Sequence, residues 1–173
     1  MSGDTALLVI DVQTGLIDEG AYQADHLLAR VNNLTERARG ADVPVIYVQH
    51  NADDPQDSLH PDSPGHEIVP AVAPHQGELV VQKTTPDSFQ DTTLRQELEA
   101  RGIQKLIITG MQTDYCINAT TRRAVQLGYD VTLVSDAHTT GDGPTTQQII
   151  DDHNRDLGNE GVQLVTADKV NFK

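Results

Sequence analysis

The only cysteine of the chain, Cys116, stands where an apolar run gives way to a predicted helix. Thr113 and Asp114 precede it, and either side chain could cap that helix. In the first turn of a helix, unpaired backbone N–H groups and the helix dipole favour a thiolate, which is the nucleophilic form of cysteine. A lone cysteine is also commonly a small buried apolar residue without a chemical role. Its position alone leaves both interpretations open.

Two ionisable side chains also stand at the ends of short apolar runs. Asp11 follows residues 6–10, and Lys83 closes residues 79–83. A carboxylate beside a thiol can accept its proton as a general base and later return that proton to a leaving amine. A nearby ammonium group would hold the carboxylate and favour the thiolate. Together with Cys116 these residues could form an activated nucleophile that needs no histidine, whereas on their own they could equally form an ordinary ion pair.

Short apolar runs alternate with stretches of helical periodicity along the chain. The sequence predicts strands at residues 6–10, 43–49, 79–83, 105–110, 130–136 and 162–166. It predicts helices at residues 21–41, 91–102, 115–128 and 144–157. This alternation is typical of a parallel sheet with helices on both faces, a doubly wound, Rossmann-like α/β fold. No repeat or domain boundary is visible, so we expect a single domain over residues 1–173.

Ligands of such sheets bind outside the carboxyl ends of the strands. Several polar positions stand at ends of this sense, namely Asp11, Gln49, Lys83, residues 110–116, and Asp136 with His138. We therefore expect them to meet at one edge of the sheet. Residues 50–78 are rich in proline and show little periodicity, so we expect a long loop there that acts as a lid or binding loop.

The composition limits the classes of function. With 26 acidic and 12 basic side chains and a formal net charge of −14, the field of the protein repels nucleic acids and anionic membranes. One cysteine excludes an intrachain disulfide, no apolar run approaches the ~20 residues of a membrane helix, and the N-terminal residues do not resemble a secretory signal. We therefore expect a cytoplasmic protein that acts on a small molecule, without nucleic-acid or membrane partners.

Three separate segments resemble the isochorismatase-like cysteine hydrolase superfamily. They are ALLVIDVQ around Asp11, QKTTPDSF around Lys83 and GMQTDYCINATTRRA around Cys116. They occur in the order found in that superfamily, and the resemblance extends over about residues 5–167. It implies a three-layer α/β/α sandwich with six parallel strands in the order 3-2-1-4-5-6. Members of the superfamily commonly form homodimers or homotetramers, which is the expected assembly here.

The resemblance also implies a role for each residue. Asp11 would be the base, Lys83 the positioning cation and Cys116 the nucleophile. A non-proline cis peptide would join Met111 to Gln112, so that the backbone N–H groups of Gln112 and Cys116 form an oxyanion hole. The implied reaction is the hydrolysis of a C–N amide bond of a small molecule through a thioester intermediate, without a cofactor.

Four further side chains are candidates for substrate binding, namely Gln13, Phe89, Thr113 and His138. Gln13 could hydrogen-bond the catalytic carboxylate or a water, Phe89 could wall the pocket, and His138 could reach the pocket mouth. Turn capping, core packing and an ordinary hydrogen-bonded histidine are the respective alternatives. By the same resemblance, Thr113 and Asp114 would hold the cis peptide through hydrogen bonds.

Differences from known members of the superfamily bear on whether this chain binds a metal and which bond it cleaves. Nicotinamidases of the superfamily bind a divalent metal through an Asp-x-His after the second strand, where this chain has Gln49, His50 and Asn51. Histidines and aspartates of the following loop could in principle bind a metal, but they match no typical ligand spacing, so we expect none. Vinyl-ether cleavage of the isochorismatase type, which needs no cysteine, stays open as an alternative. A binding or scaffold protein without turnover is a second alternative. Alkylation of Cys116 at a pH well below the normal thiol pKa of about 8.5 would favour the enzyme over the scaffold protein.

Two phosphatase interpretations fit less well. Cys116 and Arg122 have the cysteine-x5-arginine spacing of tyrosine phosphatases, but the intervening residues predict a continuous helix and Asp114 would repel a phosphate dianion. Asp11 and the residues after it are similar to the nucleophile motif of haloacid dehalogenase-type phosphatases, yet Gln13 replaces the second aspartate. No Gly-x-Gly-x-x-Gly follows the first strand, so a dinucleotide site lacks its fingerprint.

Overall fold

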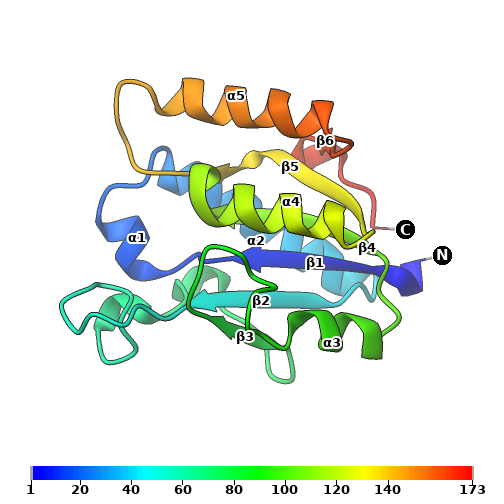
Figure 1. The fold of residues 1–173 in the computed structure, drawn as a ribbon, viewed down its shortest axis with the longest axis horizontal. Helices are drawn as coiled ribbons and strands as arrows, with labels where there is room; N and C mark the ends of the chain where they lie inside the picture. Colours follow the sequence, from blue (N-terminus) through cyan, green and yellow to red (C-terminus); the bar gives the residue numbers. More distant parts are fainter. Residues whose placement is uncertain (1, 173) are drawn as a thin grey trace.

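A six-stranded sheet forms the centre of the computed structural model, which describes residues 2–172 (Figure 1). The strands are β1 (Thr5–Ile10), β2 (Val45–His50), β3 (Val80–Lys83), β4 (Lys105–Met111), β5 (Asp130–Thr139) and β6 (Gln163–Val165). All neighbouring strands are parallel, and their order is β3-β2-β1-β4-β5-β6. The predicted fold class and strand order are confirmed.

Helices cover both faces of the sheet. They are α1 (Thr14–Asp18), α2 (Ala24–Gly40), α3 (Leu94–Ala100), α4 (Asn118–Gln126) and α5 (Thr146–Asn159). In Figure 1, α2 lies behind the sheet, whereas α3 and α4 lie in front of it. Short 3-10 turns occur at Ser2–Asp4, Pro64–His66, Pro70–Val72 and Ala167–Lys169. The five-residue α1 lies in a segment for which the sequence predicted no element.

The apolar core is divided by the sheet into two parts. Leu7 and Val9 of β1 pack in the cluster that includes the apolar side of α2, whereas Ala6, Leu8 and Ile10 pack in the cluster that includes α3, α4 and α5. Side chains alternate between the faces of a strand. A central strand of a covered parallel sheet therefore needs apolar residues at successive positions, which is why residues 6–10 are an uninterrupted apolar run.

The strand β5 is longer than predicted and contains an irregularity beside the carboxyl edge of the sheet, the edge formed by the carboxyl ends of β1 to β5. Ile108 of β4 pairs with Leu133, but Gly110 pairs with His138, so β5 has extra residues between two successive pairings. Such bulges bend a strand and redirect its side chains. As a result His138 belongs to β5 instead of following it.

Gly110 lies directly against the end of β1. Its φ is 129°, and a Cβ built on it would lie 2.1 Å from the carbonyl oxygen of Ile10. We expect Gly110→Ala to lower the free energy of unfolding by about 2–4 kcal/mol, because both the contact and the backbone conformation become unfavourable. Gly128→Ala is the matched control, since Gly128 has a φ of 92° but no heavy atom within 4 Å of such a Cβ.

Urea unfolding followed by circular dichroism measures both substitutions. The control should cost only about 1 kcal/mol, the part that comes from positive φ alone. An equal loss of stability in the two variants would show that the approach of Gly110 to β1 has no energetic importance.

The long loop predicted after the second strand is present as residues 51–79, which we call the β2–β3 loop. It is docked against α1 through two glycines: a Cβ on Gly65 would lie 2.8 Å from Cα of Gly15 and 2.6 Å from the carbonyl oxygen of Ser58. Tyr47 also holds it, by donating a hydrogen bond of 2.7 Å to the carbonyl of Val72. Its function as a lid stays a prediction.

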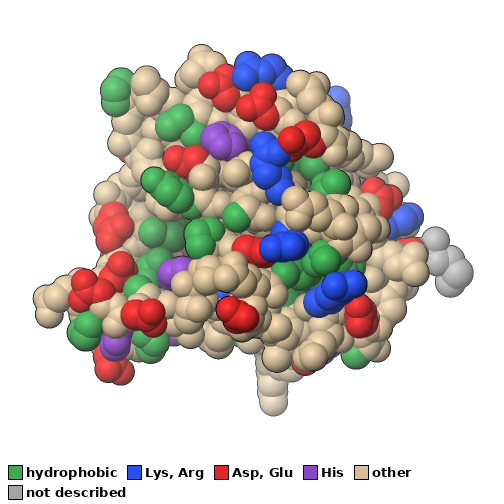
Figure 2. All heavy atoms as spheres, in the orientation of Figure 1, with side chains coloured by type: hydrophobic (Ala, Val, Ile, Leu, Met, Phe, Trp, Pro, Cys, Tyr) green, Lys and Arg blue, Asp and Glu red, His purple; other side chains and the backbone are tan. Residues whose placement is uncertain are grey.

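The surface agrees with the acidic composition. Figure 2 shows acidic side chains spread over the displayed face, with basic side chains interspersed among them. Among residues 2–172, no helix has both the length and the apolar character that crossing a membrane requires.

Candidate active site

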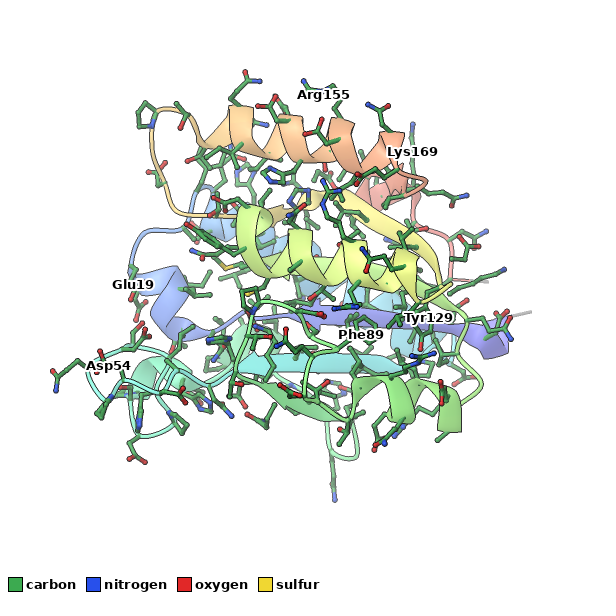
Figure 3. All side chains as sticks on the ribbon, viewed as in Figure 1. Glu19, Asp54, Phe89, Tyr129, Arg155 and Lys169 are labelled. Atoms are coloured by element: carbon green, nitrogen blue, oxygen red, sulfur yellow. The ribbon has the colours of Figure 1, made fainter. Side chains whose placement is uncertain are left out.

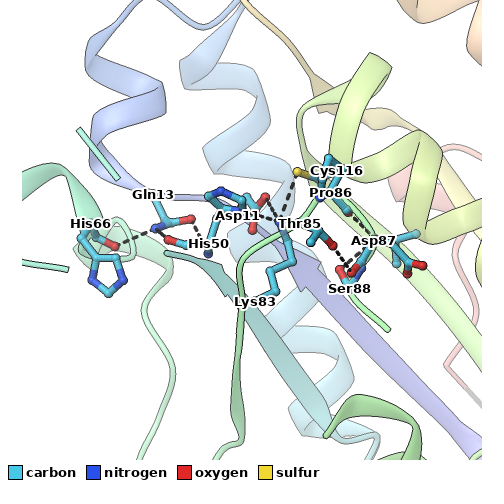
Figure 4. Close-up of polar contacts among 11 residues, drawn as sticks. Asp11, Gln13, His50, His66, Lys83, Thr85, Pro86, Asp87, Ser88 and Cys116 are labelled. Atoms are coloured by element: carbon cyan, nitrogen blue, oxygen red, sulfur yellow. Dashed lines mark hydrogen bonds and ion pairs between the residues drawn. The ribbon is translucent and has the colours of Figure 1, made fainter. Parts of the chain in front are cut away.

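Asp11, Lys83 and Cys116 meet at the carboxyl edge of the sheet (Figure 4). Nζ of Lys83 lies 2.9 Å from Oδ2 of Asp11 and donates a hydrogen bond of 3.2 Å to Sγ of Cys116. The exposed fraction of the side chain is 0% for Lys83 and 1% for Asp11. The structure therefore brings together three side chains from β3, from the end of β1 and from the turn after β4, while their catalytic roles stay predictions.

The position of Asp11 follows from the backbone at the end of β1. Asp11 has a φ of 54°, in the left-handed region that aspartate tolerates better than most residues. Its N–H still donates to the carbonyl of Val48 on β2 at 2.9 Å. The chain thus turns out of the sheet at this residue, and the carboxylate remains at the sheet edge.

A fourth side chain, His50 at the end of β2, contacts the same ammonium group. Nδ1 of His50 lies 2.9 Å from Nζ of Lys83. In the sequence, His50 is marked only as part of the segment that departs from the metal-binding motif of nicotinamidases. The contact of His50 with Lys83 could be foreseen only from the pairing of β2 with β3, whose register places the two residues side by side.

Asp11, His50 and Cys116 have ligand-type atoms within 4.8 Å of one another, a grouping compatible with metal binding. However, Nζ of Lys83 contacts all three groups, so its ammonium already supplies the positive charge at this point. A metal ion would have to displace it. In the β2–β3 loop, both ring nitrogens of His66 lie within hydrogen-bond distance of side-chain amide groups. These residues fit a lysine-centred site better than a metal centre.

The thiol of Cys116 differs from the expectation drawn from its place in the sequence. Burial, followed by the negative charge of Asp11, raises its pKa to about 12, and the opposing effect of Lys83 is smaller. Cys116 is therefore a protonated thiol at neutral pH in the resting site. The helix start favoured a thiolate in the sequence, but desolvation and a neighbouring carboxylate outweigh it. Alkylation of Cys116 across pH stays the test that separates an enzyme from a scaffold.

The helix predicted after β4 is present, and it begins with a π-helical turn that runs directly into α4. Residues Thr113–Ile117 form a π-helical turn, and the N–H of Ile117 donates to the carbonyl of Gln112 at 3.0 Å. Such turns are frequent at functional sites. The peptide bond between Met111 and Gln112 is cis, as the resemblance implies. The oxyanion hole formed by the N–H groups of Gln112 and Cys116 stays a prediction.

Thr113 and His138 belong to a buried chain of hydrogen bonds behind the turn. Nδ2 of Asn154 donates to the carbonyl of Ser135, so Oδ1 of Asn154 is free to accept from Nε2 of His138 at 2.8 Å. Nδ1 of His138 must then accept from the hydroxyl of Thr113, also at 2.8 Å. Burial lowers the pKa of His138 to about 4, in agreement with this neutral ring. This series of hydrogen bonds anchors Thr113 to β5 and α5.

Gln13 and Asp114 differ from their expected contacts. Gln13 is completely buried, and its amide binds the backbone of His50 and the carbonyl of His66, with no hydrogen bond to the Asp11 carboxylate. It therefore joins the end of β2 to the β2–β3 loop. Oδ1 of Asp114 is buried and has no hydrogen-bond partner among residues 2–172, so Asp114 is not seen to hold the cis peptide.

Phe89 and Arg122 make contacts with residues outside the triad. The ring of Phe89 stacks on that of Tyr129 with centroids 5.8 Å apart, and Figure 3 shows both rings away from the end of the molecule where Glu19 lies. Phe89 also lines a surface pocket with Asp87 and Arg123 that includes no triad residue, so its role as a wall of the active site stays a prediction. Arg122 donates to Asn118 and to Glu160, the residue that follows α5, which leaves the phosphatase spacing without a phosphate loop.

Comparison with known proteins finds a family match and several similar sequences. The family model described as Isochorismatase domain matches residues 5–167. Streptothricin hydrolase from Streptomyces noursei is 36% identical over 168 residues, which cover 95% of this chain and 60% of that protein. Ureidoacrylate amidohydrolase RutB from Variovorax paradoxus is 27% identical in an alignment that covers 79% of this chain and 70% of that protein.

The solved structures include an isochorismatase from Pseudomonas putida KT2440. It superposes with a TM-score of 0.90 at 25% sequence identity, covering 98% of this chain and 91% of the other. The chain spans only about 60% of the length of the streptothricin hydrolase that it resembles. The family match itself extends over most of the sequence, from the first strand to beyond the last. The chain therefore belongs to the isochorismatase family of hydrolases.

Proposed function

We propose that this protein is a cysteine hydrolase that cleaves a C–N amide bond of a small molecule through a thioester intermediate. The observation that carries the proposal is the contact of one buried ammonium, that of Lys83, with both the Asp11 carboxylate and the Cys116 thiol. A buried carboxylate beside a thiol is a general base beside a nucleophile. The amidohydrolase named among the relatives supports the same class of reaction.

The two oxygens of Asp11 have different surroundings, which suggests how the proton moves. Lys83 holds Oδ2, whereas Oδ1 is buried and has no hydrogen-bond partner among the described residues. Oδ1 is therefore available to take the proton of Cys116. Because the resting thiol is protonated, we infer that this transfer accompanies the attack of sulfur on the carbonyl carbon, instead of preceding substrate binding.

The remaining steps follow from that transfer. Sulfur forms a bond to the carbonyl carbon, and the N–H groups of Gln112 and Cys116 would stabilise the oxyanion. Asp11 then gives its proton to the departing nitrogen, the C–N bond breaks, and an amine or ammonia leaves. Water attacks the thioester with Asp11 again as the base, which releases the acid and restores the thiol of Cys116.

A panel of small amides tests the proposal. It begins with the compounds named for the two relatives, streptothricin and ureidoacrylate, and continues with simple carboxamides and ureides. We expect release of ammonia or amine from at least one compound. On rapid acid quenching, mass spectrometry should find an acyl adduct on Cys116.

Cys116→Ala is the control, and it should show neither the adduct nor amine release above background. Equal turnover by Cys116→Ala would reject the nucleophile and favour the alternative, vinyl-ether cleavage, which needs no cysteine. Binding of a panel compound without turnover or adduct would favour the scaffold interpretation.

A further inference from the structure

The ammonium of Lys83 has an acceptor for each of its hydrogens. An ammonium group carries three N–H donors and no acceptor. Three groups surround Nζ: Oδ2 of Asp11 at 2.9 Å, Nδ1 of His50 at 2.9 Å and Sγ of Cys116 at 3.2 Å (Figure 4). The side chain of Lys83 is fully buried, so water does not compete for these hydrogens. All three directions of the ammonium are fixed by protein groups.

The contact between Nζ of Lys83 and Nδ1 of His50 determines the tautomer of His50. Because a protonated lysine only donates, Nδ1 of His50 must accept, and the proton of the neutral ring is on Nε2. Burial, followed by the positive charge of Lys83, lowers the pKa of His50 below its usual 6.5. The lone pair of Nδ1 is occupied by Lys83 and cannot also take the thiol proton, so His50 does not compete with Asp11 as the base.

The backbone of His50 is held as firmly as its ring. Its N–H donates to Oε1 of Gln13 at 3.0 Å, and its carbonyl accepts from Nε2 of Gln13 at 3.0 Å. Gln13 is itself completely buried and follows β1 by only a few residues. Together with the pairing of His50 beside Lys83, these bonds place the imidazole in a fixed relation to β1 and β3.

We propose that His50 is a positioning residue of the active site: it takes one N–H of the Lys83 ammonium and thereby directs the other two at Asp11 and Cys116. This inference rests on the proposed cysteine hydrolase function. When sulfur gives up its proton, the N–H already aimed at it becomes a charge-assisted hydrogen bond to the developing negative charge. Without the third acceptor, one N–H of a buried ammonium is unsatisfied and its orientation is lost.

Protonation of His50 would place a second positive charge against Lys83 and break their contact. The charged groups that act on His50 are Lys83 on β3, Asp11 at the end of β1, and Asp53 and Asp57 in the β2–β3 loop. The aspartates favour protonation, whereas Lys83 and burial oppose it, and the balance lowers the pKa. Activity that depends on neutral His50 should therefore fall only when the pH drops below 6.5.

Two variants of similar size test the role. In His50→Asn the amide oxygen can occupy nearly the place of Nδ1 and accept from Lys83, whereas His50→Leu has no acceptor. We expect His50→Leu to lower kcat about 10–100-fold while KM changes less than about 3-fold. We expect His50→Asn to keep at least about one-third of kcat and to lose the acid limb of the pH profile that belongs to His50, since asparagine does not titrate.

The outcomes separate this inference from the proposed function. Wild-type kcat and an unchanged pH profile in His50→Leu would overturn the positioning role while leaving a Cys116-dependent hydrolase intact. If His50→Leu does not fold, as judged by circular dichroism, His50→Asn decides: an unchanged acid limb, or a kcat lowered by about 10-fold or more, would overturn the positioning role. Full turnover by Cys116→Ala would instead reject the proposed function itself.

Discussion

Lys83→Met is expected to lower the free energy of unfolding by about 3–5 kcal/mol and to reduce kcat/KM about 10²–10³-fold. Methionine is similar in length to lysine and can be buried without a partner, so the loss of stability and activity should come from removal of the charge. Removing the ammonium leaves the carboxylate of Asp11 buried without a counterion, and it leaves the sulfur of Cys116 without its hydrogen-bond donor. Urea unfolding gives the first effect, and steady-state kinetics on an accepted amide give the second.

The double variant Asp11→Asn with Lys83→Met is the control for stability. It removes both charges and should recover part of the stability lost in Lys83→Met, because the main cost is an uncompensated buried charge. It should remain inactive, since it lacks the base. If the single and double variants were equally destabilised, the buried ion pair would not be the reason for the loss.

Asp11→Asn is expected to reduce kcat about 10²–10⁴-fold, because the base that takes the thiol proton is gone. It should also make Cys116 easier to ionise. The charge of Asp11 raises the pKa of the thiol, so removing that charge lowers this pKa, while Lys83 still favours the thiolate. Iodoacetamide labelling of Cys116, followed by mass spectrometry across a pH series, should therefore begin at lower pH in the variant than in the wild type.

A less active enzyme with a more reactive cysteine is an outcome that general damage to the site does not produce. Asp130→Asn is the matched control, because Asp130 lies at the amino end of β5 and is not among the groups that shift the thiol pKa. It should leave the labelling profile in place. Labelling of Asp11→Asn at the wild-type pH would mean that the carboxylate does not act on the thiol.

The fold was predictable because its signal is local. Six apolar runs separated by helical stretches require a covered parallel sheet, and the rule that sites lie at carboxyl ends selects Asp11 and Lys83 among many charged residues. The strand order came from the resemblance. The bulge in β5 could not be read in this way, since it depends on how β4 and β5 pair between Ile108 and Gly110.

The site was predictable only in part, because some of its properties exist only after distant segments meet. His50 becomes a neighbour of Lys83 through strand pairing, so no local motif identifies it. The pKa of Cys116 was expected to fall from its place at a helix start, yet burial and the Asp11 charge, both products of tertiary structure, raise it. Gln13 was recognised as polar and near the site, but its partners lie on β2 and in the β2–β3 loop.

The arrangement around Lys83 has a consequence for the substrate. With one ammonium, one carboxylate, a neutral thiol and a neutral imidazole, the centre is electroneutral before a ligand arrives. Moving a proton from Cys116 to Asp11 redistributes charge without changing this sum. An uncharged carbonyl can enter such a centre without meeting a net repulsive field. Discrimination among substrates would therefore fall to side chains around the triad that do not contact Lys83, because they can vary without changing the charges of the reacting groups.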